Sequence, residues 1–243
     1  MLYLGHKTSA ESAVPDWAER FSELHDHTHH ERLRAYYAAG VVPGDTPLSD
    51  VPFVALDFET TGLNPQRDGI ISIGLVPMTL ARIQCNAARH WVVNPRRVLQ
   101  DESVVIHGIT HSAIAEAPDL MDILDDLLTA LAGRIVVVHH HLIERQFLDA
   151  ALKVRINEGI QFPVVDTMAL EGRLHRQRPP SLWDKLLRRP QPSIRLADSR
   201  TRYHLPFYQP HHALTDALAS AELLQAQIAH HYTPETPLRA LWG

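Results

Sequence analysis

The spacing of apolar residues separates a polar helical start from a body of alternating strands and helices. Up to about residue 40, a sparse apolar stripe recurs at helical spacing and predicts amphipathic helices: Trp17, Phe21, Leu24 and Leu33. The segment VVPGDTPLSDVP at 41–52 is rich in turn-forming residues and predicts a break after this start. We therefore expect a helical extension at 1–48, a main domain at 49–232 and a short tail at 233–243.

Strand patterns open the main domain, and helical patterns follow. Three apolar, β-favouring runs predict consecutive strands: FVALDFE at 53–59, GIISIGLVPM at 69–78 and the stretch at 85–93. Helices are predicted at 112–117, 120–131, 142–156, 167–175 and 213–230, with further strands at RIVVV (134–138) and FPVVD (162–166). This order predicts an α/β fold in which helices cover both faces of a mixed sheet.

Composition narrows the protein class. The chain is 45% hydrophobic and 21% charged, as in ordinary globular proteins. The single cysteine, Cys85, excludes an internal disulfide and agrees with a reducing compartment. No apolar run could cross a bilayer and the start has no apolar signal core, so we expect a cytoplasmic protein without membrane association.

The charge is unevenly distributed along the chain. The net charge is −5, yet residues 173–210 contain eight arginines and one lysine against two acids. Such a basic segment on an acidic body can attract a polyanion locally. A solvated surface loop explains the same composition equally well.

Two carboxylates lie two residues apart in the first predicted strand. Side chains alternate along a strand, so Asp57 and Glu59 share one face while Phe58 faces the other. Adjacent acids repel each other, and a cation would balance them. The same spacing also arises by chance on solvated strands, but here four apolar residues precede the pair and a glycine turn follows it.

Two further segments carry candidate site residues. Glu144 falls in the first turn of the helix predicted at 142–156, where the helix dipole favours any acid, with or without a function. Asp216 lies early in the last helix, and His211 precedes it by five residues, which is a rotation of about 140° on a helix. We therefore place His211 in the entering loop, where its pKa suits a general base; an ordinary surface histidine is the alternative.

Together these segments resemble the DEDDh exonucleases, the DnaQ-like group. The resemblance rests on LDFETTGL around Asp57, on HHHLIE ending at Glu144, and on H-x-A-x-x-D from His211 to Asp216. It implies a ribonuclease H-like fold and 3′→5′ exonuclease activity. Two divalent cations, Mg²⁺ or Mn²⁺, would be held by Asp57, Glu59, Glu144 and Asp216, with Asp57 between them and His211 as general base.

The chain departs from the family pattern at two positions of the second motif. Glu144 stands where the family has aspartate, and His140 where it usually has asparagine. Glutamate keeps the charge and reaches about 1.5 Å further. We interpret it as a tolerated variant. The alternative is a weak or inactive nucleic-acid-binding or partner module.

The resemblance also predicts where the substrate binds. Thr60, Gly62 and Leu63 would contact the terminal nucleotide. His107 in IHGIT and His139 would also bind substrate. Arg188 and Arg189 of the basic segment would guide the strand. We expect DNA 3′ ends as the partner, single-stranded ends preferred; an exoribonuclease is the nearest alternative.

Two peripheral segments complete the sequence-based expectations. The residues after the third motif are few for a polymerase-tethering tail, so we expect a free-standing enzyme. The histidine-rich HDHTHHE at 25–31 is interpreted as a solvated helix face, with a transition-metal site as the alternative.

Overall fold

The computed structural model describes residues 15–96, 109–176 and 191–242. Three predicted substrate contacts, His107, Arg188 and Arg189, lie outside the described residues.

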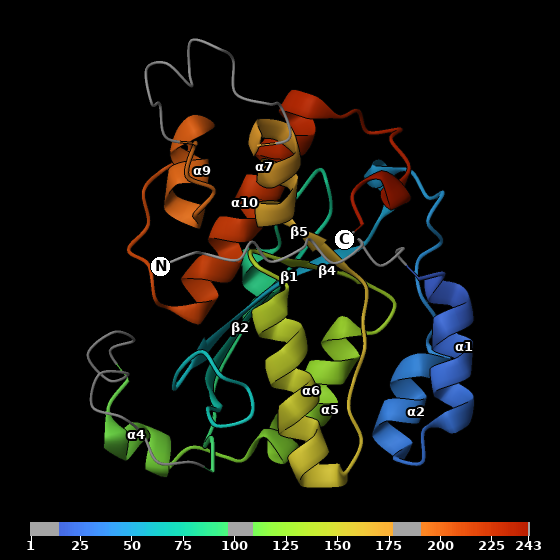
Figure 1. Ribbon diagram of the computed structural model, residues 1–243, viewed down its shortest axis with the longest axis vertical. Coiled ribbons are helices and arrows are strands. Elements are labelled where there is room, and N and C mark those ends of the chain that lie inside the picture. Colours follow the sequence, from blue (N-terminus) through green and yellow to red (C-terminus); the bar gives the residue numbers. More distant parts are fainter. Residues whose placement is uncertain (1–14, 97–108, 177–190, 243) are drawn as a thin grey trace, which may run out of the picture.

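Five strands of the described residues form one mixed sheet, as the strand patterns predicted (Figure 1). In sheet order these are β3 (Arg89–Val92), β2 (Ile70–Met78), β1 (Phe53–Thr60), β4 (Ile135–Val138) and β5 (Val164–Asp166). The first three pair antiparallel, while β4 and β5 run parallel to β1. The predicted strand at 85–93 is shorter than expected, because Cys85–Ala87 form a 3-10 turn ahead of β3.

Helices cover both faces of the sheet, which confirms the predicted fold class. The described helices are α1 (Trp17–His27), α2 (Glu31–Ala38), α4 (His111–Ala115), α5 (Leu120–Leu131), α6 (Leu142–Ile156), α7 (Thr167–Arg176), α9 (Leu196–Arg202) and α10 (Ala213–His231).

Alternation along β1 explains which helices pack on which face. Val54 and Leu56 belong to a hydrophobic cluster with residues of α1, α2, α5 and α6. Phe53 and Ala55 point the other way, into a second cluster with residues of α7 and α10. Asp57 continues the second set at the same period of two, so its carboxylate lies on the α10 face of the sheet.

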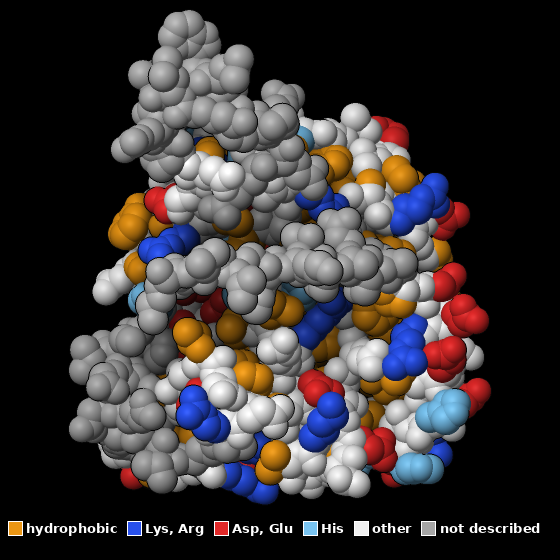
Figure 2. Space-filling view, viewed as in Figure 1, with side chains coloured by type: hydrophobic (Ala, Val, Ile, Leu, Met, Phe, Trp, Pro, Cys, Tyr) orange, Lys and Arg blue, Asp and Glu red, His pale blue; other side chains and the backbone are white. Residues whose placement is uncertain are grey.

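The N-terminal helices share the core of the main domain. The aromatic rings of Trp17, Phe21, Tyr36 and Tyr37 pack together and join the cluster on the α5 face. The outer surface of these helices is charged and rich in histidine (Figure 2). Among the described residues, the histidines at 25–30 do not form a group of three ligand atoms within 4.8 Å of one another.

The C-terminal segment lies against the connection between α2 and β1. Leu48 N donates to Thr236 O, and Leu238 N donates to Thr46 O. Leu48, Leu238 and Leu241 are buried in the cluster on the α10 face. None of the described helices is both long and apolar enough to cross a membrane.

Candidate active site

Three carboxylates meet where β1 faces the start of α10. Asp57 and Glu59 lie on β1, and Asp216 lies in the first turn of α10. One oxygen from each lies within 4.8 Å of the others, and among the described residues this is the only group of three that could hold a metal ion. The period of two along the strand puts Asp57 and Glu59 on one face, and Asp216, more than 150 positions later in the chain, completes the carboxylate cluster.

A glycine on β2 allows α10 to come this close to the sheet. Gly74 pairs with Asp57 in the β1–β2 register. A Cβ at Gly74 would lie 2.2 Å from the carbonyl carbon of Ala213, the first residue of α10. Because only a residue without Cβ fits, Gly74 sets the distance between the strand that carries Asp57 and the helix turn that carries Asp216.

The fourth predicted acid, Glu144, is buried in the first turn of α6. Its side chain is 2% exposed, and its Oε2 has no hydrogen-bond partner among the residues the structure describes. After burial, the Glu144 charge is the largest cause that raises the pKa of Asp57, so the two carboxylates interact electrostatically. A buried carboxylate oxygen without a partner is costly unless a proton or a cation compensates it.

The acids raise one another's pKa values. Burial and the charges of Glu144, Glu59 and Asp216 raise the pKa of Asp57 well above its ordinary value. The pKa of Asp216 is also raised, by burial and by Glu59, although the His211 backbone amide opposes the shift. Four carboxylates in this space cannot all be ionised without positive charge among them.

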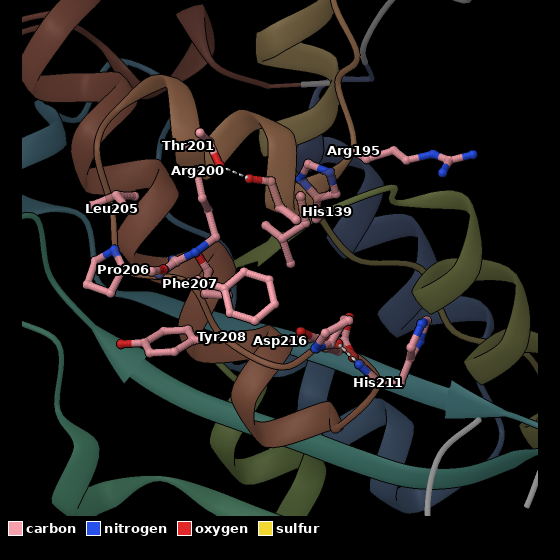
Figure 3. A pocket seen from close by; sticks show the side chains of 15 residues that line it. His139, Arg195, Arg200, Thr201, Leu205, Pro206, Phe207, Tyr208, His211 and Asp216 are labelled. Atoms are coloured by element: carbon pink, nitrogen blue, oxygen red, sulfur yellow. Dashed lines mark hydrogen bonds between the residues drawn. The ribbon is translucent and has the colours of Figure 1, made fainter. Parts of the chain in front are cut away.

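His211 lies in the loop that enters α10, as the sequence predicted. Its backbone N–H donates to Asp216 Oδ2 at 2.8 Å. Its φ is 71°, in the left-handed region that non-glycine residues seldom adopt. The side chain is exposed and lines a cavity next to Asp216 (Figure 3). A backbone strained in this way persists only where the surroundings impose it, and such positions are frequent at functional sites.

Asp166 ties β5 to the junction between β4 and α6. Its carboxylate accepts the backbone N–H groups of His140 and His141 at 3.0 Å, and His141 Nδ1 lies 2.7 Å away. Burial raises the pKa of Asp166, but the hydrogen bonds from His141 and His140 outweigh it and hold the pKa well below its usual range. The ionised carboxylate therefore fixes the chain just ahead of Glu144.

The second departure from the family pattern has a backbone explanation. His140 has a φ of 96°. Asparagine and histidine are both enriched among the non-glycine residues that adopt positive φ. Histidine is therefore, like asparagine, a residue type that this backbone conformation admits.

His139 is held by the protein through both ring nitrogens. Nδ1 lies 2.8 Å from Thr167 Oγ1, and Nε2 lies 3.1 Å from Ile194 O. Burial lowers the pKa of His139 to about 4, so the ring is neutral at pH 7. Thr167 Oγ1 in turn donates to Val138 O at 2.9 Å, which ties His139 to the end of β4. Both ring nitrogens are engaged by the protein, so the predicted contact of His139 with substrate would be made by its ring carbons, which line the cavity described below.

The turn after β1 presents Leu63 to solvent. Thr60 Oγ1 donates to Gly62 O at 2.6 Å, and Asp68 Oδ2 accepts from Asn64 N at 2.8 Å, which closes the turn. Leu63 is 84% exposed at its tip.

A cavity of about 500 Å³ adjoins the carboxylates (Figure 3). Asp57, His211 and Asp216 line it on one side, and residues of α9 and the following loop line the other. Sequence reasoning treated that loop only as part of a basic segment and missed Phe207, which is 79% exposed in the cavity wall. The available signal was the large aromatic residue in a Pro-rich loop just ahead of the third motif.

Comparison with known proteins covers the same part of the chain. The RNase_T exonuclease family model matches residues 54–224. The chain is 33% identical over 156 residues to the PolC-type DNA polymerase III of Thermotoga maritima, covering 62% of this chain and 11% of that polymerase. It is 29% identical over 181 residues to the DNA polymerase III subunit epsilon of Treponema pallidum, covering 74% of this chain and 78% of that subunit. The chain thus spans about a tenth of the PolC-type relatives it matches.

Solved structures share the fold. The nuclease domain of 3′hExo, a DEDDh family member, bound to rAMP superposes with a TM-score of 0.59 at 15% identity, covering 74% of this chain and 92% of that one. Exonuclease X in complex with 5′ overhanging duplex DNA superposes with a TM-score of 0.57 at 22% identity, covering 76% and 97%. At these identities the likeness establishes the ribonuclease H-like fold.

Proposed function

Because the chain belongs to the RNase_T exonuclease family, in its DnaQ-like DEDDh group, we propose that it is a metal-dependent 3′→5′ exonuclease acting on DNA ends. Family and fold support nuclease activity on nucleic-acid ends. We propose in addition that the enzyme degrades strands from their 3′ ends, depends on divalent metal ions and acts on DNA.

The carboxylate cluster is the main support for this proposal. Asp57, Glu59 and Asp216 bring carboxylate oxygens within 4.8 Å, and the buried Oε2 of Glu144 has no hydrogen-bond partner among the described residues. Such an arrangement fits divalent cations, because oxygen ligands are those that Mg²⁺ and Mn²⁺ prefer. The same four side chains would hold the ions, and bound there the ions would activate water and stabilise charge on the phosphate.

Two side chains of the protein have further roles in the proposed reaction, one in proton transfer and one in substrate binding. His211, in the loop beside Asp216, accepts the proton of the water that attacks phosphorus. The bond from phosphorus to the 3′ oxygen breaks, which releases a nucleoside 5′-monophosphate and leaves a 3′ hydroxyl on the shortened strand. The exposed Leu63 contacts the terminal nucleotide by its apolar surface, which requires no particular base.

DNA is the proposed substrate because the sequence relatives are named as DNA polymerase III polypeptides. An RNA substrate is the second candidate, since a structure of the same fold holds rAMP. Hydrolysis of DNA and of RNA would use the same residues in the same roles, so the experiment below distinguishes between these substrates.

The test is cleavage of 5′-labelled single-stranded DNA, duplex DNA and RNA with Mg²⁺ or Mn²⁺ and with EDTA. We expect stepwise shortening of single-stranded DNA that EDTA abolishes. Asp57→Asn should lower the rate by about 10³-fold or more, because the cluster loses its central charge. Asp45→Asn, an exposed acid outside the cluster, is the matched control and should cleave normally.

Two results would overturn the proposal. The first is cleavage by Asp57→Asn at the rate of the unaltered protein. The second is failure of the unaltered protein to shorten any of the three substrates, which would favour a binding module that has lost catalysis.

A further inference from the structure

The cavity beside the carboxylates is larger than the cluster itself needs. Its volume of about 500 Å³ lies in the range typical of small-ligand sites. It extends from Asp57 and Asp216 to the α9 helix and the loop after it, and no residue of the 60–69 turn lines it. The space therefore lies apart from the Leu63 turn.

The far wall of the cavity is largely apolar. Leu196, Leu205, Pro206 and Phe207 line it. Phe207 is 79% exposed, one of four large apolar side chains left exposed among the described residues. Its ring lies between Arg200 and Asp216 (Figure 3). An exposed aromatic face next to a catalytic centre is a natural platform for a planar ligand.

Two polar side chains of this wall, Arg200 and Tyr208, are already bound to the protein. Arg200 donates to Ala219 O at 2.7 Å and to Pro206 O at 2.9 Å, and it pairs with Glu222 at 2.7 Å. Tyr208 Oη donates to the other oxygen of Glu222 at 3.0 Å. These groups cannot also pair with the edge of a base. Around Phe207 the wall therefore offers stacking and apolar contact, which tolerate any base, while the exposed Arg195 lines the cavity further along.

The same bonds hold Phe207 in place. The Arg200 guanidinium lies 4.5 Å from the centre of the Tyr208 ring and binds the carbonyl just before Phe207. Behind it, the buried Glu171 accepts from Tyr203 at 2.9 Å and from Gln227 at 2.8 Å, which joins α7, α10 and the loop after α9. A fixed aromatic platform loses little entropy when a ligand stacks on it.

We propose that this cavity binds the nucleotide on the 5′ side of the scissile phosphate, with its base stacked on Phe207. The inference rests on the proposed exonuclease function, in which the terminal nucleotide contacts the Leu63 turn. The unit across the scissile bond then lies away from that turn, and the cavity adjoins the carboxylates without contact with the turn. Phe207 is thus a substrate-binding residue that the three motifs do not contain.

The test compares two substrates that differ only on the 5′ side of the scissile phosphate. One is a single-stranded oligonucleotide. The other is the methyl ester of thymidine 5′-monophosphate, which keeps the terminal nucleotide but has neither a base nor any other ring beyond the phosphate; its cleavage is followed by the thymidine 5′-monophosphate released. Phe207→Ala should lower kcat/KM on the oligonucleotide by about 10-fold, mainly through KM, because base stacking contributes about 1–3 kcal/mol. On the ester the change should stay within about two-fold.

Matched variants separate stacking from other effects. Phe207→Trp should restore the oligonucleotide value, since it keeps an aromatic face. Val154→Ala, on α6 and 66% exposed, removes exposed apolar surface elsewhere and should behave normally. Leu63→Ala should lower kcat/KM on both substrates.

Binding in EDTA makes the inference independent of catalysis. Fluorescence anisotropy of a labelled 12-nucleotide strand should show about 10-fold weaker binding for Phe207→Ala. Equal losses on oligonucleotide and ester, or unaltered binding by Phe207→Ala, would overturn the inference. If the unaltered protein cleaves neither substrate, the proposed function fails, and the binding measurement still decides whether Phe207 contacts the strand.

Discussion

Glu144 stands where the motif of the family has aspartate. Its side chain is buried in the first turn of α6, next to a chain segment fixed by Asp166. The additional methylene carries the carboxylate further than aspartate would reach, yet Oε2 meets no protein donor among the described residues. We infer that the oxygen is kept for a cation rather than for the fold.

The buried charge of Glu144 predicts a pH-dependent stability in metal-free protein. Burial raises its pKa well above the ordinary value, opposed by a backbone hydrogen bond and helped by Asp166. A raised pKa contributes stability that is complete below the unfolded pKa of about 4.3 and is lost as pH rises through the folded pKa. Glu144→Gln should therefore be more stable than the unaltered protein at pH 8, with the difference vanishing near pH 4.

Urea unfolding in EDTA at pH 4, 6 and 8 measures this difference. Glu235→Gln, an exposed acid of the C-terminal segment, is the control and should show none. In nuclease assays Glu144→Gln should lose about 10²-fold or more, while Glu144→Asp should stay within about 10-fold. A Glu144→Gln variant that is less stable at pH 8 would show that a protein partner engages the carboxylate.

Among the elements, the contact of α10 with the sheet assembles the site. The helix packs along β1 and β2 through small residues, Ala213, Ala217 and Ala221, all fully buried. Its first turn reaches the backbone of β2 at Gly74, directly across from Asp57. The relative position of Asp57 and Asp216 therefore depends on the absence of one methyl group.

Gly74→Ala tests that dependence. The added Cβ meets backbone rather than a flexible side chain, so α10 must shift. We expect a loss of about 1–3 kcal/mol in the free energy of unfolding and about 10²-fold in nuclease rate, since displacement of about 1 Å is enough. Gly172→Ala in α7 is the control, because its Cβ would meet nothing within 4 Å and should stabilise the helix. Full activity of Gly74→Ala would contradict the proposed role of this contact.

At the scale of the whole molecule, α1 and α2 are part of the described core. Their aromatic side chains bury against α5 and α6 in the same cluster that covers one face of the sheet. Tyr36 is 3% exposed, with its ring centre 5.6 Å from that of Phe21 and 5.3 Å from that of Tyr37. We expect these helices to unfold together with the main domain.

Tyr36→Ala measures how strongly the two parts are coupled. Removal of a buried aromatic side chain should lower the free energy of unfolding by about 3–5 kcal/mol. Circular dichroism and tryptophan fluorescence should report one coincident transition in urea. Arg34→Ala, exposed on α2, should have little effect. Separate transitions would show that α1 and α2 form an independent extension.

Local patterns predicted most of the elements because their causes are local. The period of two along 53–59 put Asp57 and Glu59 on one face, and the helical period located α5, α6 and α10 within a few residues. The motifs at Asp57, Glu144 and His211 indicated the family before any contact was known. Those inferences need only neighbours in the sequence.

Other features depend on residues far apart in the chain. Nothing near Gly74 indicates that Ala213 packs on it, and nothing near Phe207 indicates an open cavity beside Asp57. The sequence by itself determined the strand and helix order and the candidate acids, since backbone sterics and side-chain period act over a few residues. Only the tertiary structure decided how close those acids lie and which surfaces stay open, because close packing joins segments that the sequence separates.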